Sequence, residues 1–115
     1  MFFKQESNAE YSCFMIVYNN TIKVEWPIVE EWLTWQLETH IPEVMFTGLF
    51  DDFKIYRLLE RDDSEGPTFV IQYFTSKEEN YSRYISEFEM LLQQKAFEKW
   101  RNQFVSYSTS MKLVS

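Results

Sequence analysis

The sequence predicts a single α+β domain of the ferredoxin-like type, in which the elements follow the order β-α-β-β-α-β. Two observations lead to this prediction. Four segments rich in β-branched and aromatic residues occur together with two segments whose apolar residues recur with the helical period. The 115 residues also match the usual length of one domain. We therefore expect residues 14–115 to form a four-stranded antiparallel sheet with two main helices on one face, preceded by an N-terminal extension at residues 1–13.

The first strand and the first helix are read from the N-terminal half of the chain. The run CFMIVYNNTIKVEW, residues 13–26, consists largely of β-branched and aromatic residues, as strands do. Pro27 suits the first turn of a helix, and the residues after it divide into an acidic side and an apolar side. Because proline disfavours the α conformation in the residue before it, Pro42 is expected to end this helix near His40.

The remaining elements are two adjacent strands, a second helix and a final strand. The two strands are predicted at residues 50–60 and 68–76, and an amphipathic helix is predicted to follow them. Lys95 falls on the apolar stripe of that helix, so we expect a break there. Residues 104–115 form the last strand, and one of its faces is mostly polar, as suits an edge strand.

The sheet face away from the helices is expected to need a cover. Two helices cover one face, but the first strand carries Phe14, Ile16 and Tyr18 on one side and Met15 and Val17 on the other. An exposed face with such side chains would be an unusually large apolar patch. A second copy related by two-fold symmetry is the simplest cover, so we predict a homodimer through this face.

Composition argues against several classes of function. The formal net charge of −7 disfavours nucleic acid, whose phosphates require Lys and Arg, and disfavours an anionic membrane surface. A single cysteine, Cys13, excludes multi-cysteine metal sites. Pro42 lies between His40 and Glu43 and should break the helical spacing of a metal pair, so no metal or other cofactor is predicted. Because the sequence shows neither a signal peptide nor a run of apolar residues that could span a membrane, a cytoplasmic location is expected.

Three stretches, IKVEWPIVEEWLTWQLETHIPEVMFTG, YRLLERDDSEGPTFVIQYF and KAFEKWRNQF, resemble a small bacterial family, domain of unknown function 4286. The likeness runs from about Met15 to Ser115. More broadly, the chain resembles dimeric α+β barrels, in which two ferredoxin-like sheets face each other. Some of those proteins are cofactor-free monooxygenases or isomerases, and others bind haem through a histidine on the second helix. The second helix of this chain contains no histidine, so the resemblance does not extend to haem.

His40 is the central candidate for a functional site. It falls with Gln36 on the apolar side of the first helix, where polar side chains need hydrogen-bond partners. One interpretation is a pocket between helix and sheet, in which His40 acts as a general base or orients a ligand. The other interpretation is a histidine that donates to a carbonyl at the C-terminus of the helix and helps to end it. The sequence does not decide between them.

Four further residues are pocket candidates. Trp32 lies at core spacing on the first helix, and Tyr18 or Tyr73 would handle protons in an enzyme. Arg57 shares its strand parity with Phe53, Ile55 and Leu59, so it would face an apolar layer and need a carboxylate. The other interpretation of Arg57 is an ion pair between an edge strand and an acidic loop.

Three functions follow from these observations. The first is a small dimeric module that binds a small apolar or aromatic ligand. The alternative is a cofactor-independent enzyme, monooxygenase- or isomerase-like, with a pocket near His40. The third is an accessory or purely structural dimer with a packed interior. No residue is assigned a catalytic role, because two glycines allow neither a phosphate loop nor a nucleophile elbow. The enzyme hypothesis requires a pocket of some hundreds of cubic ångströms that His40 reaches.

Overall fold

The computed structural model describes residues 14–59 and 62–115. The N-terminal extension predicted at residues 1–13 lies outside the described residues, and so does Cys13. Within the described ranges, no helix combines the length and the apolar composition that crossing a membrane requires.

Four strands form one antiparallel sheet in the order β2-β3-β1-β4. The strands are β1 (Ile16–Val24), β2 (Asp52–Arg57), β3 (Thr68–Thr75) and β4 (Phe104–Lys112). β1 pairs with β3 on one side and with β4 on the other, and β2 pairs only with β3. This order, with its two helical crossovers, is the ferredoxin-like arrangement, so the predicted fold class is confirmed. β4 is an edge strand, as its polar face predicts.

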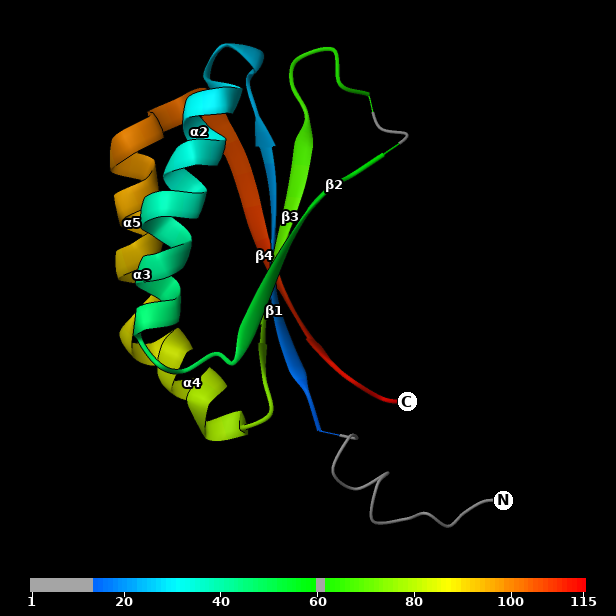
Figure 1. The fold of residues 1–115 in the computed structure, drawn as a ribbon, viewed down its shortest axis with the longest axis vertical. Coiled ribbons are helices and arrows are strands. Elements are labelled where there is room, and N and C mark those ends of the chain that lie inside the picture. Colours follow the sequence, from blue (N-terminus) through cyan, green and yellow to red (C-terminus); the bar gives the residue numbers. More distant parts are fainter. Residues whose placement is uncertain (1–13, 60–61) are drawn as a thin grey trace.

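The helices lie together on one face of the sheet (Figure 1). The first crossover consists of η1 (Trp26–Ile28), α2 (Val29–Trp35), η2 (Gln36–His40) and α3 (Ile41–Phe46). The second consists of α4 (Glu78–Glu87), α5 (Glu89–Trp100) and η3 (Arg101–Gln103).

The first helix does not end near His40, and the prediction made from Pro42 is wrong. Ile41 is helical, with φ −60° and ψ −44°, and its backbone N–H donates to the carbonyl of Gln36, five residues earlier. This bond makes η2 a π-helical turn, which is wider than an α-helical one. The wider turn accommodates Pro42, whose ring would clash with the carbonyl four residues earlier in a regular α-helix. The helical axis therefore continues past the proline, and His40 lies inside the helical segment.

The second helix breaks at Phe88 and not at Lys95. Phe88 separates α4 from α5 with φ −125° and ψ −30°. The buried side continues across the kink through Tyr84, Phe88 and Leu92, and Lys95 lies beside it. Lys95 is accordingly exposed in an uninterrupted α5, and its Nζ lies 3.1 Å from a carboxylate oxygen of Glu43 in α3. The ion pair lies at the surface between the two crossovers.

The core lies between the helices and one face of the sheet. Its fully buried side chains include Tyr18, Trp32, Ile41, Val44, Ile71 and Tyr73. β4 contributes much less bulk to this face than β1 and β3 do. Ser106, Ser108 and Ser110 pair with Ile22, Asn20 and Tyr18 of β1, and directly paired residues point to the same face. Small side chains on β4 therefore leave space beneath α5.

We call the sheet face without a described helix the open face. Its apolar members are Val17, Tyr56, Val70, Phe74, Val105, Tyr107 and Met111. A polar row crosses its centre, where Gln72 donates to Oδ1 of Asn19 at 3.1 Å and Asn19 donates to the hydroxyl of Thr21 at 3.3 Å. The open face is thus less uniformly apolar than the sequence predicts, although Tyr56 and Tyr107 remain 48% and 62% exposed.

Candidate functional site

A cavity of about 440 Å³ lies between the helical layer and the half of the sheet formed by β1 and β4. Its apolar walls include Ile22, Trp32, Ala96, Phe97 and Phe104. Its polar walls are Asn20, Gln36, His40, Gln93, Arg101, Asn102, Ser106 and Ser108. The cavity exists because serines of β4, rather than large apolar residues, lie opposite α5. Its volume is in the range of small-molecule sites, about 300–1,000 Å³.

The π-helical turn places two polar side chains at this cavity. Gln36 and His40 are the first and last residues of η2, and their side chains are 3% and 9% exposed. The imidazole of His40 stacks on the indole of Trp35, with 4.7 Å between ring centroids. π-helical turns are rare and are frequent at functional sites, where they change the direction of side chains. The turn that accommodates Pro42 thus also carries two of the polar residues that line the cavity.

Both side chains retain a buried polar atom without a hydrogen bond. Among the described residues, neither Nδ1 of His40 nor Oε1 of Gln36 has a partner. An unsatisfied buried polar atom costs about 1–3 kcal/mol. His40 does not help to end the helix, as the second interpretation expects, because the helix continues through Ile41, and its Nδ1 donates to no carbonyl of the described residues.

His40 is uncharged at neutral pH. Burial is the main cause, and it lowers the pKa of His40 to about 4 from the ordinary value of 6.5. Glu43 partly opposes this effect and Lys95 adds to it. A neutral imidazole offers one N–H donor and one nitrogen acceptor. His40 is consequently an uncharged polar member of the cavity lining.

A second polar cluster borders the cavity where β1 and β4 meet α5. The Tyr18 hydroxyl donates to Oε2 of Glu89 at 2.6 Å and lies 3.3 Å from the hydroxyl of Ser108. Ser108 donates to Oδ1 of Asn20 at 2.9 Å, and Gln93 donates to Ser108 at 3.4 Å. Burial and the Glu89 carboxylate raise the pKa of Tyr18 far above its ordinary value, so its proton stays on the hydroxyl. Sequence reasoning missed Gln93, Ser108 and Glu89, because only the tertiary fold brings three elements together.

The structure brings together three of the residues singled out in the sequence. His40, Gln36 and Trp32 line the cavity, and Tyr18 reaches it through the hydrogen bond to Ser108. Trp32 is also a core residue, with its ring centroid 5.2 Å from that of Phe69.

Tyr73 and Arg57 lie away from the cavity. Tyr73 is fully buried in the core, 5.4 Å from Phe50 between ring centroids, and its hydroxyl has no described partner. Arg57, on the opposite edge strand, donates to a carboxylate oxygen of Asp63 at 2.7 Å and lies over the ring of Trp26. Of the two interpretations of Arg57 given by the sequence, the structure shows the ion pair between an edge strand and an acidic loop.

The described side chains include no group of three or more His, Cys, Asp or Glu residues arranged to hold a metal ion. The donors at the cavity are amides, hydroxyls, one imidazole and one guanidinium. Such a set favours hydrogen bonding to an organic molecule over coordination of a metal.

Fold and cavity together define a ferredoxin-like α+β protein with a cavity of ligand size between its helices and its sheet. The chain belongs to the family described as domain of unknown function DUF4286, which matches residues 15–114. No curated protein matches the sequence at a significant level.

Solved structures share the fold at low sequence identity. A dimeric ferredoxin-like protein from an uncultured marine organism is 13% identical, with a TM-score of 0.67 over 89% of this chain and 97% of that one. SnoaB, a cofactor-independent oxygenase from Streptomyces nogalater, is 13% identical, with a TM-score of 0.57 over 84% and 90%. A dimeric ferredoxin-like protein of unknown function from Thermobifida fusca YX is 10% identical, with a TM-score of 0.52 over 86% and 92%. At these identities the likeness establishes the fold.

Proposed function

We propose that this protein binds a small organic ligand with an apolar, aromatic-sized body in the cavity between α5 and the sheet. The observation that supports this proposal best is the cavity of about 440 Å³ itself, whose lining combines apolar walls with uncharged polar residues such as His40 and Gln36. A ligand of this size can bury its apolar surface in the cavity and form hydrogen bonds with the amides and hydroxyls of the lining. Ile22, Trp32 and Phe104 supply apolar wall against which a ring can pack.

Binding of a bicyclic aromatic probe tests this function. We expect 2-naphthamide and 2-naphthoate to bind the wild-type protein and to raise its melting temperature. Ala96→Trp should weaken binding of both probes by about tenfold or more, because an indole on α5 would occupy the cavity. Calorimetric titration measures the effect.

Met90→Trp is the matched control for this experiment. Met90 lies on the same helix and is 80% exposed, so the same substitution there leaves the cavity free. Binding that survives Ala96→Trp, or that Met90→Trp removes equally, would contradict the assignment of the cavity.

Proton transfer at His40 is the second candidate function. Its support is the neutral imidazole at the cavity wall, which can accept a proton from a bound substrate. The fold that the chain shares with a cofactor-independent oxygenase is compatible with this candidate. A base with a pKa of about 4 is weak at neutral pH, so the substrate would have to raise that pKa. Ligand binding needs no such shift and is the better-supported function.

We also propose that the protein forms a homodimer through the open face. The support is the row of exposed side chains on the edge strands, Tyr56 on β2 and Val105, Tyr107 and Met111 on β4. Two of the structural neighbours are dimeric ferredoxin-like proteins. Face-to-face packing of two such sheets would bury these side chains against their counterparts.

Tyr56→Lys should convert the dimer to a monomer, because a charge would be buried at the interface without a partner. Sedimentation at micromolar concentration measures the mass. Phe46→Lys is the control, because Phe46 is 92% exposed on α3, away from the open face, and should leave the dimer intact. A monomeric wild-type protein, or a dimer that only Phe46→Lys dissociates, would rule out the open face.

A further inference from the structure

The cavity differs in charge from the protein as a whole. The chain has 18 acidic and 11 basic residues, for a formal net charge of −7. Among the described residues that line the cavity there is no carboxylate, and Arg101 alone carries a formal charge. The remaining polar lining consists of neutral amides, hydroxyls and the imidazole of His40. An acidic protein thus contains a cavity whose one formally charged lining residue is a cation, and the nearby Glu89 carboxylate is already bound by the Tyr18 hydroxyl.

No carboxylate of the described residues forms an ion pair with the guanidinium of Arg101. The other two arginines whose placement is described form ion pairs, Arg57 with Asp63 at 2.7 Å and Arg83 with Glu87 at 3.3 Å. Within residues 14–59 and 62–115, Arg101 forms neither an ion pair nor a side-chain hydrogen bond. Its nearest aromatic contact is the ring of Phe97, which also lines the cavity, at 5.7 Å. All five N–H donors of the guanidinium therefore remain for an acceptor outside the described chain.

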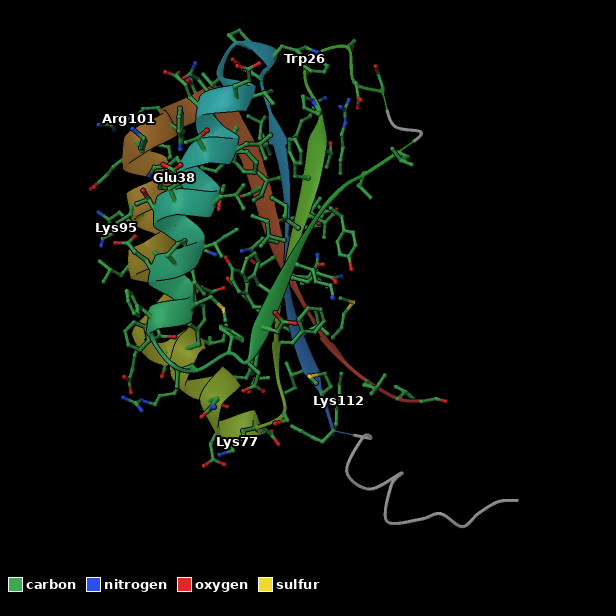
Figure 2. The ribbon with its side chains drawn as sticks, viewed as in Figure 1. Trp26, Glu38, Lys77, Lys95, Arg101 and Lys112 are labelled. Carbon is green, nitrogen blue, oxygen red and sulfur yellow. The ribbon has the colours of Figure 1, made fainter. Side chains whose placement is uncertain are left out.

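Arg101 also has a backbone conformation that residues other than glycine rarely adopt. It caps α5 with φ 55° and ψ −128°, and its backbone N–H donates to the carbonyl of Phe97. Glycine is the residue that adopts such a conformation readily, and another residue there costs about 1–3 kcal/mol. The chain bends sharply at this point, so Arg101 lies at the C-terminal end of α5 (Figure 2), where its exposed side chain forms part of the cavity rim.

We infer that the ligand is an aromatic or similarly apolar molecule with one compact negative group, such as a carboxylate, which Arg101 binds at the cavity rim. This inference rests on the proposed ligand-binding function. A guanidinium binds a carboxylate through two parallel hydrogen bonds. The apolar body would then extend inward along Phe97 toward Trp32, in the part of the cavity that His40 and Gln36 also line.

A pair of probes that differ only in charge tests the inference. 2-Naphthoate and 2-naphthamide share the same ring system, and only the first is an anion at pH 7. The wild-type protein should bind 2-naphthoate about tenfold or more tightly than 2-naphthamide, as expected for a charge-assisted bidentate contact. This preference opposes the net charge of −7, which by itself disfavours an anion.

Arg101→Gln should abolish the preference, so that the variant binds 2-naphthoate and 2-naphthamide with affinities within about twofold of each other. Lys99→Gln is the matched control: it removes the same charge two residues away, from a side chain that lies over the Trp100 ring and does not line the cavity. The preference should survive in that variant. Equal binding of the two probes, or a preference that persists in Arg101→Gln, would overturn the inference while leaving the ligand-binding function in place. If neither probe binds the wild type, the proposed function and the inference both fail.

Arg101→Gly provides a second variant whose folding is not at risk. It relieves the strained backbone at the end of α5, so its melting temperature should rise above that of the wild type in the absence of probe. Its preference for 2-naphthoate should nevertheless be lost. A glycine variant that keeps the preference would show that another group binds the negative charge.

Discussion

Lowering the pH from 7 to 4 is expected to reduce the free energy of unfolding by about 3 kcal/mol more in the wild-type protein than in a His40→Gln variant. In the unfolded chain His40 has its ordinary pKa of 6.5, whereas burial lowers the pKa to about 4 in the folded protein. Between these two values the unfolded state binds the extra proton. Stability is therefore complete above pH 6.5 and is lost as the pH falls toward 4.

Urea denaturation at several pH values between 4 and 7 measures this effect. His40→Gln is the suitable comparison, because glutamine is polar and does not titrate. Glu43 and Lys95, the charged groups that influence His40, are unchanged in the variant. If the free energy of unfolding changes with pH equally in the wild type and in His40→Gln, His40 is not buried in its neutral form. Bound 2-naphthoate should reduce the pH dependence, because a negative charge at the cavity raises the pKa of the imidazole.

Gly66→Ala is expected to destabilise the protein by at least about 3 kcal/mol. A Cβ atom at this position would lie 1.8 Å from the carbonyl oxygen of Val24, which is backbone and cannot move as a side chain can. The contact occurs where the end of β1 meets the chain entering β3, and the N–H of Val24 donates to the carbonyl of Pro67 there. Relief of the clash would separate two central strands. Equilibrium unfolding of the purified variant gives the difference in free energy.

Gly48→Ala is the matched control for this prediction. Gly48 follows α3 with φ +75°, but a Cβ atom there would have no neighbour within 4 Å. Only the cost of the left-handed backbone remains, roughly 1–2 kcal/mol. Equal losses of stability in the two variants would mean that the close approach between Gly66 and Val24 is not rigid.

Local sequence patterns were sufficient for the order and type of the elements. Strand segments such as the one containing Tyr18 and Ile22 are rich in β-branched and aromatic residues, which favour a strand regardless of distant contacts. Pro27 at the start of the first helical segment and the left-handed Gly48 after its end are likewise local preferences. The polar face of β4, which consists largely of serines, is also a local pattern, and it predicted an edge strand.

Predictions about helix ends were less successful, because tertiary packing selected among nearly equal local alternatives. Pro42 is compatible with a helix end and with a π-helical turn, and burial of Ile41 and Val44 in the core favours the continuous helix. Lys95 is compatible with a helix break and with a surface ion pair, and Glu43 on the neighbouring segment provides the pair.

The sequence by itself determined the ferredoxin-like fold and placed His40, Gln36 and Trp32 on the core-facing side of one helix, because both results depend on residue spacing within single elements. Only the tertiary structure showed that a cavity lies beside these residues and that Arg101 stands at its rim. The cavity results from the small serines of β4 lying opposite α5, and the position of Arg101 results from the sharp bend at the end of that helix. Neither arrangement has a local sequence pattern, because each depends on the size and position of side chains that are brought together only when the chain folds.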